Sequence, residues 1–295
     1  MADVEIEDTF AEAFPMIAGR VLITAENDDW AMNSARSATG FASSIIMSPA
    51  EAGIEGPKAS PKKTPDGRPG VYIQVYHRTG REFKMQMLAR IGQCILTCPT
   101  TAAFDAIPKA KKRLKLGRTI RYFGDGFQKK DQMAGRDIWR IPVMEGEFII
   151  EDKFGVKRAV AGGNLLIMAK DQTIGLEAAE KAVLAIKGVE GVITPFPGGI
   201  CRSGSKVGSM KYKLLASTNH PFCPVLKDSI ENSVLPAGTG AVYEIVINGL
   251  TLSLVERAMK VGLKAAMDVE GVMKITAVNF GGKLGPFKIN LKDLL

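Results

Sequence analysis

A segment rich in glycine and serine, "PFPGGICRSGSKVGS" (residues 195–209), is the first place where this sequence could bind a charged ligand. A phosphate-binding P-loop requires Gly, four further residues, and then Gly-Lys-Ser/Thr. Gly199 and Gly204 have that spacing, but Ser205 follows Gly204 and Lys206 comes one position too late. The pattern therefore argues against a nucleotide cradle. It leaves either a simple tight turn or a loop that binds a different anion.

The glutamate in "AVYEIVI" has the most unusual setting of any charged residue in the sequence. Alternation along a strand places Glu244 on one face with Val242 and Val246. A carboxyl that loses solvation has its pKa raised, so it can stay protonated near neutral pH. Such a group could act as a general acid or donate a hydrogen bond to an oxyanion. The alternatives are a carboxylate paired with Lys206 or Lys283, or one that points to solvent.

Thiol and metal chemistry have weak support in the sequence. The chain has four cysteines and two histidines, and it contains no Cys-x-x-Cys pair, so we expect no metal site. Cys94 and Cys98 lie in "QCILTCP", which we predict to be a strand. A nucleophilic dyad of Cys223 and His220 would lack a third group to orient it. We expect buried free thiols in a reducing compartment.

The charge is basic, with a formal net charge of +8, and much of the excess lies in "KAKKRLKLGRTIR" (residues 109–121). Such a run is either a solvated surface or a site that attracts a polyanion. No basic motif interleaved with aromatic residues accompanies it, so we expect no nucleic-acid partner. The sequence has no apolar run long enough for a membrane span and no pattern of a signal peptide. We therefore expect a cytoplasmic protein.

These candidate residues must be positioned by a repeated unit of strand, helix and strand. "GGNLLIMA" is followed by a helical stretch and "VEGVITPF", and eighty residues later "YEIVING" is followed by a helix and "VEGVMKITAVNF". The loop at 195–209 then has a counterpart in "GGKLG", which contains Gly281, Gly282 and Lys283. Glycines at these positions allow positive φ and a close approach of the backbone to a partner.

The first half has two similar segments, residues 20–49, which end in the predicted strand "FASSIIMSP", and residues 70–99. Residues 122–152 alternate between polar and apolar and predict antiparallel hairpin strands. Paired strand–helix–strand units are the pattern of ferredoxin-like folds. We therefore predict an α+β protein of two ferredoxin-like lobes related by an internal repeat, with extra hairpin strands. The expected lobes are residues 1–150 and 151–295. No strand is followed by Gly-x-Gly-x-x-Gly, which argues against a Rossmann fold.

Motifs along almost the whole chain resemble formylmethanofuran:tetrahydromethanopterin formyltransferases. They are "VEIEDTFAEAF", "TPDGRPGV", "RIGQC", "PFPGGI", "SGSKVG", "YEIVINGL" and "NFGGKLG". The resemblance implies two similar α/β lobes, a homotetramer, and no metal or tightly bound prosthetic group. It also implies transfer of a formyl group between the amine of methanofuran and a ring nitrogen of tetrahydromethanopterin, as in methanogenesis or formaldehyde oxidation.

"RYFGDGFQ", "ILTCPT" and "CRSGSKVGS" look similar to the bacterial branch, whose members are subunits of a formyltransferase/hydrolase complex. A mainly structural or substrate-channelling subunit is therefore the alternative function. Ser48 stands where archaeal members often have a cysteine, which argues against thiol chemistry at that position.

The resemblance also assigns roles to residues. Glu244 matches the glutamate of the family motif that is regarded as catalytic. The two coenzymes carry carboxylates or a phosphate, so the glycine loops and their cations are expected to bind them. Asn219 and Asn248 could donate hydrogen bonds to a pterin or an oxyanion. The predicted binding residues are Gly198, Gly199, Arg202, Ser205, Lys206, Asn219, Asn248, Gly281, Gly282 and Lys283.

Overall fold

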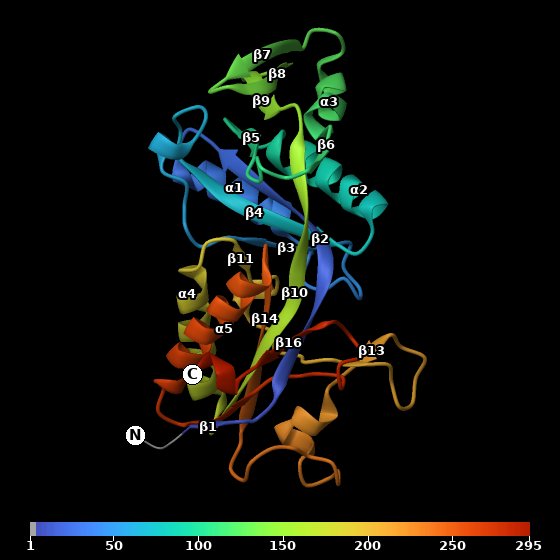
Figure 1. The fold of residues 1–295 in the computed structure, drawn as a ribbon, viewed down its shortest axis with the longest axis vertical. Helices are drawn as coiled ribbons and strands as arrows, with labels where there is room; N and C mark the ends of the chain where they lie inside the picture. Colours follow the sequence, from blue (N-terminus) through green and yellow to red (C-terminus); the bar gives the residue numbers. More distant parts are fainter. Residues whose placement is uncertain (1–3) are drawn as a thin grey trace. The chain divides into compact units, whose positions relative to one another are not determined.

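The structure is a computed structural model that describes residues 4–295. Contacts divide these residues into two compact units. The C-terminal unit consists of residues 4–15 together with Val160–Leu295, and the N-terminal unit is Met16–Ala159. Two long strands, β2 (Phe10–Thr24) and β10 (Phe154–Ala169), contribute residues to both units (Figure 1). The two lobes predicted to meet near residue 150 remain a prediction. The boundary between the two compact units lies between residues 159 and 160.

The C-terminal unit contains a mixed sheet covered on one face by two helices, α4 (Gln172–Lys187) and α5 (Leu252–Met267). In this sheet β15 (Val272–Thr276) pairs with β1 (Glu5–Ile6) and β10, and β14 (Ala241–Gly249) pairs with β10 and β11 (Val192–Ile193). β16 (Phe287–Asn290) pairs with β2, and β12 (Lys206–Val207) forms a small hairpin with β13 (Ala216–Ser217). The order β10–α4–β11 and β14–α5–β15 is the predicted repeat of strand, helix and strand.

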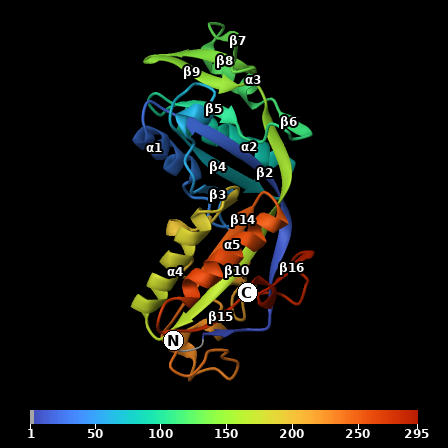
Figure 2. The same cartoon turned by 60° about the vertical axis from the view of Figure 1, so that its left-hand side comes forward.

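The two helices begin at side-chain caps and pack closely against each other, as Figure 2 shows. The side chains of Asp171 and Thr251 accept hydrogen bonds from the backbone N–H groups of Ile174 and Leu254, at 2.9 and 3.3 Å. Such caps satisfy N–H groups that have no partner within the helix. The helix faces turned to the sheet are rich in alanine and branched aliphatic residues and are fully buried. The helices therefore brace the sheet from one side only and leave its other face for a site.

The N-terminal unit repeats this plan and adds a hairpin. β2 pairs with β4 (Gly70–His77) and β5 (Ala102–Asp105), and β4 pairs with β3 (Glu51–Ile54). Helices α1 (Asp28–Thr39) and α2 (Gly80–Arg90) pack on β4, whereas α3 (Leu116–Ile120) follows the short strand β6 (Lys112–Leu114). β9 (Gly146–Glu151) continues the sheet beside β5 and pairs with β8 (Arg136–Val143), which pairs with β7 (Lys129–Met133). The α+β class and the hairpin strands within residues 122–152 are confirmed.

Two predicted strands of this unit are wrong. The "QCILTCP" run begins in a π-helical turn at Ile91–Ile95 that continues α2, and its remaining residues form turns before the strand β5 begins. This continuation buries Ile91 and Ile95 in the core, with 1% and 0% of each residue exposed. "FASSIIMSP" forms bends and turns, and the strand β3 begins only at Glu51. Ile91 and Ile95 are thus buried without strand pairing, whereas Phe41 and Met47 of "FASSIIMSP" are largely exposed, at 78% and 81%.

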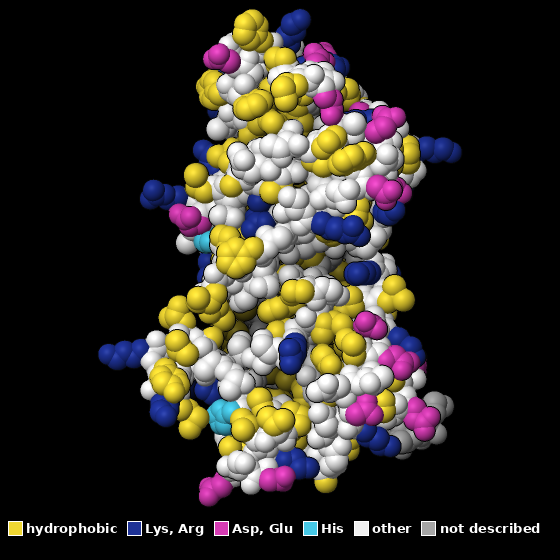
Figure 3. Space-filling model, turned by 180° about the vertical axis from the view of Figure 1, so that it is seen from behind, with side chains coloured by type: hydrophobic (Ala, Val, Ile, Leu, Met, Phe, Trp, Pro, Cys, Tyr) yellow, Lys and Arg dark blue, Asp and Glu magenta, His cyan; other side chains and the backbone are white. Residues whose placement is uncertain are grey.

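The basic run at residues 109–121 is partly neutralised within its own unit. Arg113 forms ion pairs with Asp105 at 2.9 Å and Glu151 at 3.2 Å, and Arg118 pairs with Asp152 at 3.1 Å. On the face seen in Figure 3, Lys and Arg side chains (dark blue) are scattered among acidic and hydrophobic ones. Within residues 4–295, no helix is long and apolar enough to cross a membrane.

Candidate active site around Glu244

Glu244 lies in the middle of β14, between the neighbouring strand β10 and the loop that contains Cys201. On one side its register partner is Leu166 of β10. On the other side it forms a backbone bridge with Cys201: the Cys201 N–H donates to the Glu244 carbonyl at 2.7 Å, and the Glu244 N–H donates to the Cys201 carbonyl at 3.1 Å. The "PFPGGICRSGSKVGS" segment is therefore laid directly beside the strand that carries Glu244.

The side chain of Glu244 lies on the sheet face opposite the two helices. Ile245 and Ile247 point into the helix-covered core, so Glu244 shares the other face with Val242 and Val246, as strand alternation predicts. Burial raises the pKa of the Glu244 carboxyl to about 7, although a hydrogen bond with the Cys201 thiol opposes the rise. At neutral pH a large share of Glu244 is therefore protonated and can donate a hydrogen bond.

Neither of the two lysines considered as alternative partners of Glu244 forms an ion pair with it in the described residues. The Lys206 ammonium donates to the Ser217 hydroxyl at 2.8 Å and so ties β12 to β13. Lys283 is exposed. Within residues 4–295, no ion pair joins either lysine to Glu244. The interpretation of Glu244 as a carboxylate paired with a lysine thus has no support in the structure. The pKa of its carboxyl is set mainly by burial.

A cavity of about 750 Å³ lies next to this carboxyl. Its walls are residues 196–197, 200–205 and 216–218, which come from the glycine-rich segment and from the strand β13. Two predicted binding residues, Arg202 and Ser205, line it and are exposed. Cys201 lines the same cavity and contacts Glu244, so the carboxyl is one residue away from the cavity wall. The arrangement can hold an anionic substrate group beside a protonated acid.

Gly198 and Gly199 have a conformational role at the entrance of this segment. Both have positive φ, 64° and 91°, within a tight 3-10 turn. A Cβ atom on Gly199 would also lie 2.6 Å from the Thr194 hydroxyl and 2.8 Å from a methyl of Val183. Turning and close packing therefore account for these two glycines, and their backbone shapes the loop that carries Arg202.

The two predicted asparagines have different surroundings. Asn248 is fully buried, and its side-chain oxygen accepts the Gly162 N–H at 3.1 Å, where the register of β10 shifts. This contact makes Asn248 a structural support of β10. Asn219 lies near the cavity, because a Cβ atom on the lining residue Gly204 would be 3.7 Å from the Cβ of Asn219. Asn219 is therefore next to a lining residue of the cavity, although it is itself buried, with 8% exposed, and does not line the cavity.

The second glycine loop already holds a carboxylate of its own chain, that of Glu12 on β2. One oxygen accepts N–H groups of Phe280 and Gly282 at 2.7 and 3.1 Å. The other accepts those of Leu284 and Gly285, the latter at 2.8 Å. Burial alone would raise the pKa of Glu12, but these backbone donors outweigh it and lower the pKa. The Gly282 N–H is thus occupied, and Lys283 is the exposed cation of this loop.

Glu12 is a buried carboxylate that the sequence analysis did not single out, and its contacts give it a structural role in the second glycine loop. It is 1% exposed and lies between Ala11 and Ala13, which are both fully buried. The argument that singled out Glu244, a carboxyl within an apolar strand, applies equally to "FAEAF". Its partners could not be found in this way because they lie more than 260 residues away in the chain.

Metal and thiol chemistry gain no support from the structure. Within residues 4–295, no three His, Cys, Asp or Glu side chains are grouped so that they could hold a metal ion. The Cys223 thiol contacts the Thr218 hydroxyl and the Asn219 carbonyl, at 3.4 and 3.5 Å. The His220 imidazole instead lies 3.3 Å from the amide of Asn232. A nucleophilic dyad of Cys223 and His220 is therefore not assembled.

Comparison with known proteins gives matches over nearly the full chain. The family model "Formylmethanofuran-tetrahydromethanopterin formyltransferase" matches residues 1–143, and the model "FTR, proximal lobe" matches residues 146–294. Formylmethanofuran–tetrahydromethanopterin formyltransferases from Methanopyrus kandleri and Methanocaldococcus jannaschii are each 56% identical, over 99% of this chain and 98% of their own length.

Two solved structures have the same fold. The formylmethanofuran:tetrahydromethanopterin formyltransferase of Methanosarcina barkeri has 53% identity and a TM-score of 0.97, covering 99% of this chain and 98% of that one. A chain of the formyltransferase/hydrolase complex from Methylorubrum extorquens, solved with methylofuran, has 46% identity and a TM-score of 0.94, covering 99% and 96%.

Proposed function

Because the chain belongs to the formylmethanofuran–tetrahydromethanopterin formyltransferase family, it is a formyltransferase of one-carbon metabolism, and we propose that Glu244 is its catalytic carboxyl. The reaction is the transfer of a formyl group between methanofuran, or an analogue, and tetrahydromethanopterin. The observation that carries the proposal is the raised pKa of Glu244 beside a cavity that is lined by the glycine-rich segment.

The proposed chemistry is direct transfer through a tetrahedral adduct. The acceptor nitrogen attacks the formyl carbon, a C–N bond forms, and negative charge develops on the formyl oxygen. The protonated carboxyl of Glu244 donates a hydrogen bond or its proton to that oxygen. Collapse of the adduct returns the proton to Glu244 and breaks the other C–N bond, and the departing nitrogen takes the proton that the acceptor lost. No covalent enzyme intermediate is required.

The cations of the glycine-rich segment are proposed to bind the anionic parts of the coenzymes. The segment (residues 195–209) carries Arg202 and Lys206, and the residues that follow it, up to 227, add three lysines; this whole stretch contains no Asp or Glu and so has a local positive charge. Arg202 lines the cavity and has no ion pair within the described part of the chain. A carboxylate or phosphate at the cavity mouth would therefore meet an available guanidinium group. We keep Ser205, Lys206, Asn219 and Lys283 as supporting contacts.

The direct test is to purify this chain alone and to measure formyl transfer from formylmethanofuran to tetrahydromethanopterin, without added metal or cofactor. The proposal predicts turnover that is lost in Glu244→Ala and retained in a control such as Glu177→Gln on α4. A folded wild-type chain that turns over only in the presence of other subunits would favour the channelling role instead.

The assembly is proposed from resemblance. We propose a homotetramer in a reducing, cytoplasmic compartment, because the family is tetrameric and the four cysteines are free thiols. The match to a chain of a formyltransferase/hydrolase complex supports membership in a larger complex, and with it a role in formaldehyde oxidation. Light scattering on the purified chain tests the first point: a persistent monomer at micromolar concentration would rule out the homotetramer.

A further inference from the structure

The N-terminal unit has a second cavity, of about 700 Å³, that plays no part in the chemistry described above. It lies where the π-helical turn after α2 meets the turn between β8 and β9. Its apolar lining includes Leu96, Pro99, Phe123, Val143, Met144 and Phe148. Two carboxylates, Glu145 and Glu147, complete the lining, and no Lys, Arg or His side chain of the described residues contributes to it. The cavity is thus apolar with one acidic side.

A strained residue, Thr100, stands directly behind the cavity wall formed by Cys98, Pro99 and Thr101. Its φ is +64°, a left-handed conformation that β-branched residues rarely adopt. Such strain persists only where neighbouring contacts enforce it, and it is concentrated at ligand clamps and active sites. The preceding turn is π-helical, which is also common at functional sites.

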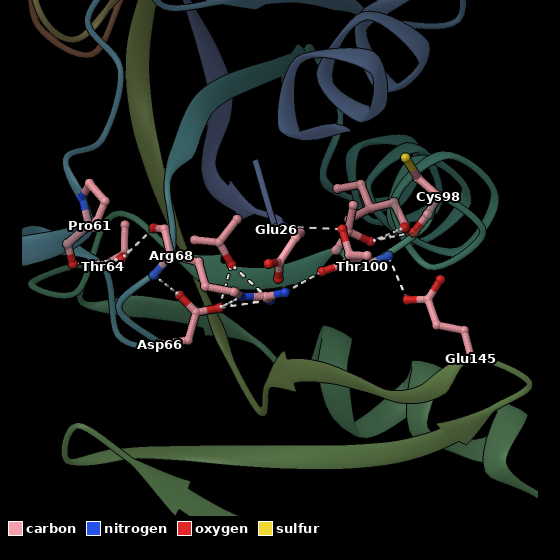
Figure 4. A network of polar contacts seen from close by, with 11 residues as sticks. Glu26, Pro61, Thr64, Asp66, Arg68, Cys98, Thr100 and Glu145 are labelled. Carbon is pink, nitrogen blue, oxygen red and sulfur yellow. Dashed lines mark hydrogen bonds and ion pairs between the residues drawn. The ribbon is translucent and has the colours of Figure 1, made fainter. Parts of the chain in front are cut away.

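Three contacts hold Thr100 in this conformation, as Figure 4 shows. The Thr100 N–H donates to the Glu145 carboxylate at 2.6 Å, and the Thr100 hydroxyl accepts the Glu26 N–H at 3.1 Å. The Thr100 carbonyl accepts a hydrogen bond from the Arg68 guanidinium. That guanidinium also donates, through its Nε, to the Asp66 carboxylate at 2.9 Å, which fixes its position. The cavity wall is therefore preorganised before any ligand binds.

The same contacts orient Glu145 and leave half of its carboxylate available. One carboxylate oxygen accepts the hydrogen bond from the Thr100 N–H, whereas the other makes no hydrogen bond or ion pair within residues 4–295. Glu147, by contrast, pairs with Arg140 at 3.1 Å. The local negative charge of the cavity is therefore carried mainly by Glu145, and it is not neutralised within this unit.

We propose that this cavity binds a planar aromatic group that carries a cationic amine or amidinium. The ring would pack against Phe123, Phe148 and the methyl of Met144, because apolar and aromatic side chains favour such burial. The cationic group would meet the Glu145 carboxylate in a charge-assisted hydrogen bond. An anionic ligand of the same size would be repelled, so the charge of the lining selects the ligand class.

The test uses benzamidine, a planar aromatic cation, and the full chain labelled at the methionine methyl groups. Titration should shift the NMR signal of Met144, whereas Met259, which is buried in the core of the C-terminal unit, should not move. Glu145→Gln keeps an oxygen for the Thr100 N–H but removes the charge, so benzamidine affinity should fall at least fivefold. The control Glu177→Gln, at an exposed ion pair on α4, should leave the affinity unchanged.

Benzoate supplies a matched anionic probe that needs no variant. The proposal predicts that benzoate leaves the Met144 signal unmoved at concentrations that saturate benzamidine. Fragment-sized ligands bind with dissociation constants up to about 10 mM, so the probe is tested up to that concentration. If the Met144 signal does not shift at about 10 mM benzamidine, the proposal is overturned. Equal shifts with benzoate, or an undiminished affinity in folded Glu145→Gln, would overturn it as well. If Glu145→Gln does not fold, the comparison of the two probes on the wild-type protein decides.

Discussion

Replacing Glu244 by glutamine should make the protein more stable at alkaline pH and not at acidic pH. A pKa raised by burial from 4.5 to about 7 corresponds to about 3 kcal/mol, at ~1.4 kcal/mol for each pH unit. Between these two values the folded protein holds a proton that the unfolded chain has released. Stability therefore falls as pH rises through this window, and the loss is complete above pH 7. Glutamine has no proton to lose, so Glu244→Gln escapes this cost.

The assay is thermal unfolding of the wild type and Glu244→Gln at pH 5 and pH 8, at one protein concentration. The difference in melting temperature between the two proteins should be small at pH 5 and should favour Glu244→Gln by on the order of 5 °C at pH 8. Glu177→Gln, which changes an exposed ion pair of α4, should show the same small difference at both pH values. A Glu244→Gln difference that is equal at both pH values would refute the burial of this carboxyl.

Three further predictions concern the loops and strands around the site. Glu12→Ala should lower the free energy of unfolding by at least ~1–3 kcal/mol, because it leaves buried N–H groups of residues 280–285 without an acceptor; an unchanged urea midpoint would contradict this. Arg202→Ala should raise the Michaelis constant of the carboxylate-bearing coenzyme about two- to fivefold at unchanged kcat, since the side chain is exposed; equal constants would remove Arg202 from the site. Asn248→Ala should cost ~1–3 kcal/mol of stability and leave both Michaelis constants unchanged in steady-state assays, and a raised constant would restore it as a binding residue.

Local patterns in the sequence were enough to predict several parts of the fold and the site. Strand alternation placed Glu244 on a face with Val242 and Val246, because the period of two is a property of the strand itself. The repeat of strand, helix and strand was visible because helix caps and glycine turns recur at equal spacing. The same local rules failed at "QCILTCP", since a short apolar run fits a strand or a buried helical turn equally well.

Contacts between distant segments could not be predicted from such patterns. The backbone bridge between Cys201 and Glu244 joins residues that are 43 positions apart, and no pattern in either segment predicts this pairing. The loop around Gly281 and Gly282 has the composition of an anion-binding loop, yet part of its binding capacity is used by Glu12 of the same chain. Composition indicated the chemistry of these loops, and only the fold shows which anion each one meets.

The central claim is that Glu244 performs the chemistry, and turnover of its variants at saturating coenzymes tests it most directly. Loss of a group that stabilises an oxyanion lowers turnover by ~10²–10³. We predict at least this loss in Glu244→Ala, with circular dichroism like that of the wild type. We also predict a wild-type pH profile in which activity falls as pH rises through about 7, where the carboxyl loses its proton. A folded Glu244→Ala enzyme with near-wild-type turnover would contradict the account and move the catalytic role to another residue.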